Sequence, residues 1–221
     1  MTKLKVAAVG AGRMGRGIAH SFAYGGVDIT LIDLKSRTAD EAERVRGEAR
    51  HEVENTVGLM AGFGLIDEAK SRRVLERVSY VSRDDAAAAL ADVDIVFEGV
   101  PEKVELKEDA LLFIERCVDE TCVITSTTST IDVDTLAGYL ARPERFLNAH
   151  WLNPAYLIPL VEVSPSARTS RHITARLKEL LESVGKVPVE CAATPGFIVP
   201  RIQAIAMNEA ARMVEEGVAS A

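Results

Sequence analysis

The sequence contains few cysteines, no long apolar run and no excess of basic residues. No run of about eighteen uncharged apolar residues occurs, and residues 1–10 have the pattern of a strand rather than of a signal segment. The 26 Lys and Arg are scattered and are outnumbered by 33 Asp and Glu, which argues against nucleic acid and anionic membranes as partners. Cys117, Cys122 and Cys191 lack C-x-x-C spacing, so we expect buried thiols in a reducing compartment, the cytoplasm, with no disulfide framework and no metal site.

The 221 residues, 48% of them hydrophobic, are enough for one large domain, or for one domain and part of another. Short Val- and Ile-rich runs alternate with helical patterns, which predicts an α/β fold with a doubly wound, mostly parallel sheet. The expected strands lie at 5–10, 28–33, 78–81, 94–100, 122–126, 146–152, 160–163 and 187–190.

Two segments depart from this alternation. Residues 36–77 are long, charged and interrupted at "GLMAGFG" (58–64), which predicts a helical hairpin that either covers a ligand or is simply a solvated excursion. Residues 198–217 form one helix with an apolar stripe and a terminal Gly217. That stripe needs a partner surface, which is the sheet domain, a second domain or another subunit.

The run "VGAGRMGRGIA" (9–19) has the G-x-G-x-x-G spacing of a dinucleotide-binding turn. Gly10, Gly12 and Gly15 follow an expected strand and open an expected helix, with Arg13 and Met14 between them. Asp33 ends the next strand, where its carboxylate can accept the adenosine ribose hydroxyls and repel a 2'-phosphate. The pattern predicts NAD as the cofactor, although the nearby Lys35 and Arg37 soften the exclusion of NADP.

Three polar residues interrupt the apolar stretch "HWLNPAYLIPLVEV" (150–163): His150, Asn153 and Glu162. Hydride loss from an alcohol also releases a proton, which a histidine can accept near neutral pH, and a carboxylate behind the ring can stabilise the imidazolium. From the residues alone, a hydrogen-bonded core histidine is the favoured interpretation, because such histidines are common in strands. The other histidines, His20, His51 and His172, lie in polar helical stretches, where we expect them on the solvated surface.

The order of these motifs resembles the L-3-hydroxyacyl-CoA dehydrogenase superfamily. The blocks that carry the resemblance run through nearly the whole chain, namely "GAGRMG" with Asp33, "EGVPEKVELK" (98–107), "STTSTI" (126–131), "HWLNP", "PLVEV", "GKVPV" (185–189) and "ATPGF" (193–197). The resemblance implies a Rossmann-type NAD-binding domain at 1–191. It also implies that 192–221 begins an all-α C-terminal domain, present here in truncated form, that serves dimerisation and substrate binding in a homodimer.

Roles follow from the same resemblance, position by position. It implies that His150 takes the proton of the 3-hydroxyl group and that Glu162 orients His150. Ser129 and Asn153 would hydrogen-bond near the reacting oxygen, and Glu102 and Lys107 would hold the ribose on the nicotinamide side. Without the resemblance, Ser129 and Asn153 would be interpreted as ordinary turn residues.

The substrate stays open, because the sequence departs from the family pattern. Pro200 stands where the family usually has an asparagine near the substrate, and the hairpin has the apolar "GLMAGFG" where acyl-CoA members have basic and polar residues. The segment "NPAYLIPLVEVSPS" is more similar to the corresponding segment of members acting on small polar 3-hydroxy acids, such as carnitine and gulonate dehydrogenases, and of the related lambda-crystallin of lens. We expect an (S)-3-hydroxyacyl substrate in the form of its CoA thioester, as the resemblance implies, with a polar 3-hydroxy acid or a non-catalytic structural role as alternatives.

Overall fold

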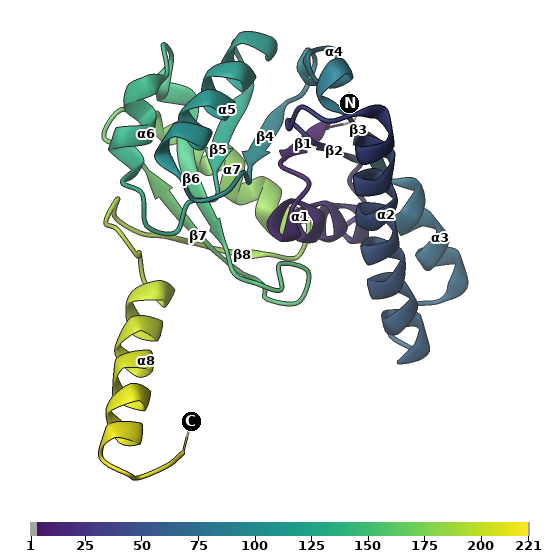
Figure 1. Cartoon of the computed structure of the whole chain (residues 1–221). Helices are drawn as coiled ribbons and strands as arrows, with labels where there is room; N and C mark the ends of the chain where they lie inside the picture. Colours follow the sequence, from purple (N-terminus) through teal and green to yellow (C-terminus); the bar gives the residue numbers. More distant parts are fainter. Residues whose placement is uncertain (1–3, 221) are drawn as a thin grey trace.

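The centre of the protein is an eight-stranded sheet, seen in a computed structural model that describes residues 4–220. The strand order is β3-β2-β1-β4-β5-β6-β7-β8, and only the β6–β7 pair is antiparallel (Figure 1). The strands are β1 Val6–Val9, β2 Ile29–Ile32, β3 Val78–Val81, β4 Ile95–Glu98, β5 Val123–Ser126, β6 Phe146–Trp151, β7 Leu160–Pro165 and β8 Val187–Glu190. Each lies within or overlaps a predicted strand, and the doubly wound, mostly parallel sheet is confirmed.

Helices cover both faces of this sheet. They are α1 Arg13–Tyr24, α2 Ala39–Gly62, α3 Glu68–Glu76, α4 Ala86–Leu90, α5 Val104–Cys117, α6 Val133–Tyr139, α7 Arg171–Ser183 and α8 Val199–Glu215, with short 3-10 turns η1 Arg83–Asp85 and η2 Pro143–Arg145. One buried cluster joins α1, α2, α3 and α7 to the sheet, and a second joins α4, α5 and α6 to its other face. Because side chains alternate along a strand, Val6 and Ala8 of β1 enter the first cluster while Ala7 and Val9 enter the second.

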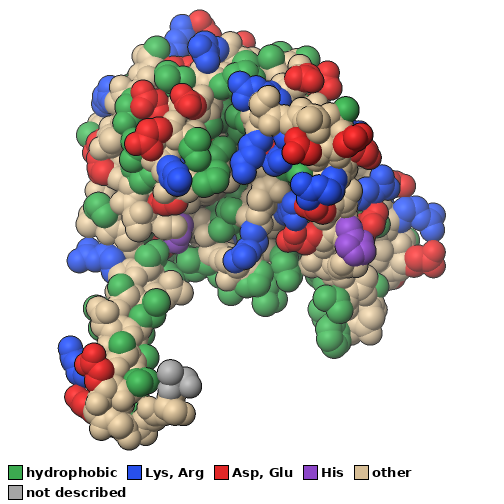
Figure 2. Space-filling model, in the orientation of Figure 1, with side chains coloured by type: hydrophobic (Ala, Val, Ile, Leu, Met, Phe, Trp, Pro, Cys, Tyr) green, Lys and Arg blue, Asp and Glu red, His purple; other side chains and the backbone are tan. Residues whose placement is uncertain are grey.

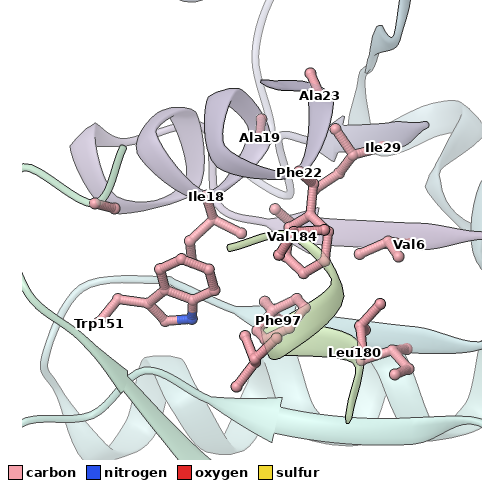
Figure 3. Close-up of a cluster of buried hydrophobic side chains, with 14 of the residues drawn as sticks. Val6, Ile18, Ala19, Phe22, Ala23, Ile29, Phe97, Trp151, Leu180 and Val184 are labelled. Carbon is pink, nitrogen blue, oxygen red and sulfur yellow. The ribbon is translucent and has the colours of Figure 1, made fainter. Parts of the chain in front are cut away.

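The first cluster is centred on three aromatic rings from distant parts of the chain (Figure 3). Phe22 of α1 packs against Phe97 of β4 and Trp151 of β6, with ring centroids 5.2 and 6.0 Å apart, and Phe97 meets Trp151 edge-on at 5.7 Å. Aromatic rings in such tilted arrangements contribute beyond the apolar area that they bury. The cluster fixes β6, the strand of His150, against α1, the helix that opens at the glycine turn.

The insertion between β2 and β3 is the predicted helical hairpin. Thr38 and Glu41 form a reciprocal capping box at the start of α2, and Asp67 caps α3. A single stripe of α2 is buried, at Val45, Ala49, Val53 and Val57, and beyond it the hairpin extends past the sheet (Figure 1). The apolar Leu59, Phe63 and Leu65 at its tip are exposed.

The last helix, α8, stands away from the sheet domain. Every residue from Arg201 to Glu215 is exposed, and apolar side chains are visible along the helix in Figure 2. Ile202 and Ile205 are 62% and 72% exposed. Of the three predicted partner surfaces for its stripe, docking on the chain's own sheet domain is therefore not observed (Figure 1).

Among residues 4–220, no helix has both the length and the apolar character to cross a bilayer. All three cysteines are free thiols; Cys122 is buried, and Cys117 and Cys191 are partly so.

The prediction that His20 lies on the solvated surface is wrong. The side chain is 2% exposed, and neither ring nitrogen has a hydrogen-bond partner. The reason is the segment 153–159, which folds back onto α1: its Ala155 carbonyl accepts a hydrogen bond from Ser21 Oγ, and the Tyr156 ring lies 5.2 Å from the imidazole. His51 and His172 are exposed as predicted.

This burial predicts an acid-sensitive step in stability. Burial, together with the positive charge of Lys186, lowers the pKa of His20 from 6.5 to about 4. The unfolded chain therefore binds this proton more tightly, so the contribution of a neutral His20 is complete above pH 6.5 and is lost as the pH falls through about 4. The loss in the free energy of unfolding is about 3 kcal/mol.

The check is urea unfolding between pH 7 and pH 4. His20→Phe, which keeps a ring but cannot be protonated, should show a shallower loss of unfolding free energy towards acid than wild type. His51→Phe, at an exposed position of α2, should follow the wild-type curve. Parallel curves for wild type and His20→Phe would contradict the assignment.

Candidate active site

The turn between β1 and α1 requires glycine at two of its positions. Gly10 has φ +111, and a Cβ there would lie 2.7 Å from the Gly99 carbonyl oxygen. A Cβ at Gly15 would lie 1.9 Å from the Gly10 carbonyl oxygen, so α1 could not approach the strand. These contacts explain why the chain uses glycine where it leaves β1 and where it closes α1 onto the sheet.

The middle glycine is different, because the protein itself leaves the space beside it open. No heavy atom lies within 4 Å of a Cβ built at Gly12, which is the N-cap of α1 and carries no side-chain cap. This open space belongs to a cleft of about 990 Å³ that is also lined by Arg13, Met14, Glu102 and Ser129. Uncapped amides at a helix N-terminus bind phosphate groups, so the turn fits a pyrophosphate.

Asp33 follows β2 on the same cleft. Its Oδ2 accepts a hydrogen bond from Arg37 Nε at 2.5 Å, and its Oδ1 accepts one from the Lys35 backbone N–H at 3.2 Å. Beyond it lies a second hollow of about 390 Å³, with Val45, Tyr80 and other residues in its wall. Asp33 is thus placed where it can meet a ribose between the glycine turn and this hollow, and its pairing with Arg37 was not foreseen.

Glu102 organises the turn that carries Ser129. Its Oε1 accepts hydrogen bonds from Thr128 Oγ1 at 2.6 Å, from Ser129 N–H at 2.8 Å and from Thr130 N–H at 3.0 Å. Burial acts to raise the pKa of Glu102, but these bonds and the charge of Lys107 outweigh it, so the pKa lies below its usual value. Glu102 therefore stays ionised, and one edge of it faces the cleft.

Lys107 lies behind Glu102 and has no exposed surface. Its ammonium donates to both oxygens of the buried Glu98, at 3.0 and 3.1 Å, and reaches Glu102 Oε2 only at 3.7 Å. Glu98 Oε2 also accepts a hydrogen bond from Ser126 Oγ at 2.6 Å. Sequence reasoning missed Glu98, although its place at the end of β4, equivalent to that of Asp33 after β2, was a usable signal.

His150 and Glu162 face each other across the single antiparallel pair of the sheet. They are direct register partners of β6 and β7, so their side chains emerge on the same face. His150 Nδ1 and Glu162 Oε2 are 2.6 Å apart, and both side chains are buried. Since a carboxylate only accepts, Nδ1 carries the proton in this bond and Nε2 is left as the free base position.

Ser129 connects this pair to the cleft. Its Oγ lies 3.1 Å from His150 Nε2, and Ser129 itself lines the cleft below the glycine turn. The turn is held from a further side by Asn148, which lies two residues before His150 and donates a hydrogen bond from Nδ2 to the Thr128 carbonyl at 3.1 Å. Asn148 was not predicted as a site residue. It could have been, because residues two apart on a strand, such as Asn148 and His150, lie on the same face of the sheet.

Asn153 is the predicted site residue that the structure does not join to the others. It is exposed at a cis peptide bond to Pro154, and no hydrogen bond links it to His150, Ser129 or Glu162. The segment that follows it is tied to α1 and to Lys186, whose ammonium donates to the Ala155 carbonyl at 2.6 Å. Asn153 therefore lies outside the hydrogen-bonded series and does not line the cleft.

The turn before α8 closes the other side of the pair. Phe197 is 5% exposed, and its ring centroid lies 5.7 Å from that of His150. Glu162 Oε1 accepts hydrogen bonds from the Ile198 and Val199 N–H groups at 2.9 and 2.8 Å. Pro200 lies in the first turn of α8, where its missing N–H removes no helical hydrogen bond.

Comparison with known proteins finds matches along nearly the whole chain. The family model for "3-hydroxyacyl-CoA dehydrogenase, NAD binding domain" matches residues 5–194. A probable 3-hydroxybutyryl-CoA dehydrogenase of Deinococcus radiodurans is 32% identical over 216 residues, which cover 98% of this chain and 74% of that protein.

Two further proteins show the range of the likeness. A 5-formyl-3-hydroxy-2-methylpyridine 4-carboxylate 5-dehydrogenase of Mesorhizobium japonicum is 29% identical over 217 residues, and the match spans 96% of this chain and 65% of that relative. The crystal structure of M. tuberculosis FadB2 superposes with a TM-score of 0.89 at 29% identity, covering 99% of this chain and 74% of that chain.

Proposed function

The chain belongs to the 3-hydroxyacyl-CoA dehydrogenase family, and from that membership we propose that it oxidises the 3-hydroxyl group of an (S)-3-hydroxyacyl substrate to the 3-oxo group. The match confirms the predicted resemblance, the oxidoreductase class and NAD as the cofactor. The substrate, the direction of the reaction and the roles of individual residues are proposals.

The single observation that carries the proposal is the hydrogen-bonded series Ser129, His150 and Glu162. It starts at the cleft wall and ends at a buried carboxylate, with steps of 3.1 and 2.6 Å. A buried imidazole and a buried carboxylate are costly unless they are paired, and here the pairing leaves the outer ring nitrogen directed at the serine on the cleft wall. A non-catalytic structural role would not require that orientation.

The site residues have separate proposed roles in binding NAD and in accepting the proton. Gly12 and the start of α1 would hold the pyrophosphate, Asp33 the adenosine ribose and Glu102 the second ribose, while Lys107 would keep Glu102 in place from behind. Bound NAD supplies the acceptor for the hydride. His150 Nε2 accepts the hydroxyl proton, and Glu162 stabilises the imidazolium that forms. Ser129 would hydrogen-bond the reacting oxygen, and Asn153 would join it there once substrate is bound.

A free polar acid is the second candidate substrate. The relative from Mesorhizobium japonicum is named for a pyridine carboxylate rather than for a CoA thioester. The exposed hairpin tip, Leu59, Phe63 and Leu65, also lacks the basic side chains that would pair with CoA phosphates. These observations favour testing both classes together.

The deciding assay follows NADH absorbance. We expect NADH oxidation with acetoacetyl-CoA, and little NAD reduction with carnitine, gulonate or free 3-hydroxybutyrate. Turnover of the free acids alone would move the substrate to the second class. Absence of turnover with every compound, in protein that binds NADH, would contradict the catalytic proposal.

We also propose that α8 contributes to a homodimer and that the protein works in the cytoplasm. The exposed apolar stripe of α8 supports the first, because contiguous exposed apolar surface is typical of an interface. Three free thiols support a reducing compartment.

A further inference from the structure

Residues 196–199, which end the turn "TPGF" (194–197) and begin α8, contact every member of the proposed catalytic series. Gly196 N–H donates to the Ser129 carbonyl at 3.2 Å. The Phe197 ring packs on His150, and the two amides that follow it donate to Glu162. One short segment therefore reaches all three residues from outside the sheet.

The second oxygen of Glu162 depends on this turn. Oε2 is used by His150, and the fully buried Oε1 has the N–H groups of Ile198 and Val199 as its hydrogen-bond donors. These are among the first amides of α8, which have no partner inside the helix and lie at its positive end. If they moved away, Oε1 would be buried without a donor, and burial without hydrogen bonds favours the protonated, neutral acid.

The backbone that aims these amides is strained. Gly196 has φ +78, which glycine adopts freely, but Phe197 follows with φ +39, a region that residues with a side chain rarely adopt. Such a conformation persists only where the surroundings enforce it. The two successive left-handed residues turn the chain so that the start of α8 points at Glu162.

We propose that Phe197 is a positioning residue whose left-handed backbone aims the first amides of α8 at Glu162 and so keeps that carboxylate ionised against His150. This inference rests on the proposed function, in which His150 is the base. It also gives α8 a second role: the placement of this helix is coupled to the strength of the base.

Two substitutions at Phe197 separate the backbone from the ring. Phe197→Gly removes the ring but accepts the left-handed conformation, whereas Phe197→Val keeps an apolar side chain that is strongly disfavoured there because it is β-branched. Gly196→Ala disturbs the same turn without touching the ring. Folding of each variant is checked by NADH binding and by circular dichroism.

The first readout needs no substrate. Amide hydrogen exchange of Ile198 and Val199, measured by NMR, should be slow in wild type and in Phe197→Gly. It should be at least about 10-fold faster in Phe197→Val and Gly196→Ala, since a lost hydrogen bond of about 1.4 kcal/mol corresponds to that factor. Equal protection in all four proteins would overturn the proposal.

The second readout is the pH profile of kcat/KM. In Phe197→Val the acid limb should move to lower pH by about one unit, with kcat lowered about 10-fold or more and KM for the cofactor unchanged. A purely structural role would change stability and leave the acid limb in place. If Phe197→Gly lost rate as Phe197→Val does, the ring and not the backbone would matter, which would also overturn the proposal.

The outcome is distinguishable from failure of the proposed function. If His150→Gln retains full activity, His150 is not the base and the proposed mechanism fails. If His150→Gln is inactive while Phe197→Val and Gly196→Ala match wild type in both readouts, only the positioning role fails.

Discussion

Replacing His150 by Gln should lower kcat by roughly 10³-fold while leaving the affinity for NADH nearly unchanged. A positioned general base contributes about 10²–10⁴ in rate, and glutamine cannot accept the proton. His150 does not line the cleft, and its Nε2 lies 3.1 Å from Ser129 Oγ on the cleft wall, so we expect NADH binding not to depend on it. The measurements are steady-state turnover with the compound that the NADH assay selects and titration of NADH fluorescence.

Glutamine is the informative substitution because its side-chain amide can still donate to Glu162, so the buried carboxylate keeps a partner. His172→Gln, at an exposed position of α7, is the matched control and should keep wild-type turnover. Full activity in His150→Gln would remove His150 from the mechanism. A loss of both activity and NADH binding would indicate misfolding instead, and circular dichroism would show it.

Alanine substitutions at Gly12 and Gly15 should impair the protein for different reasons, the first through NADH binding and the second through stability. Gly12→Ala should leave the unfolding midpoint unchanged, because its Cβ meets only the open cleft. That Cβ occupies the space where a pyrophosphate approaches the backbone, so the dissociation constant for NADH should rise roughly 10- to 100-fold. Gly15→Ala should instead destabilise the protein itself, because its Cβ would lie 1.9 Å from the Gly10 carbonyl oxygen.

Thermal unfolding with and without NADH separates these two cases. Gly47→Ala is the control: this glycine is exposed within α2, where a Cβ meets nothing within 4 Å, so alanine should raise helix stability by about 1 kcal/mol. Unchanged NADH affinity in Gly12→Ala would place the pyrophosphate elsewhere. A Gly15→Ala protein as stable as wild type would contradict the close packing of α1 on β1.

Local patterns were enough for most of the architecture. Alternating Val- and Ile-rich runs predicted every strand of the described sheet, and the break at "GLMAGFG" predicted the hairpin. The pairing of His150 with Glu162 could also be predicted, because two strands that flank a proline-bounded turn place residues of one strand beside residues of the other. These features depend on residues that are close in sequence or repeat with a simple period.

The remainder depended on contacts between distant segments. His20 has polar neighbours in sequence, but its burial comes from the segment 153–159, more than 130 positions away along the chain. Lys107 was placed against a ribose, yet Glu98 had to be recognised as its partner before its buried position could be understood. The motif "ATPGF" was noticed, but no local pattern predicts a phenylalanine with positive φ. Residues 196–199 contact Ser129, His150 and Glu162, which are all distant in sequence.

The single antiparallel pair of the sheet has an evolutionary consequence. His150 and Glu162 are register partners in the β6–β7 ladder, and the buried side chains of both strands hold that register. Substitutions in the segment 152–159 that joins the two strands can therefore change its surface without displacing His150 or Glu162. Under the proposed mechanism, a lineage with this arrangement can change its substrate while keeping the same proton acceptor.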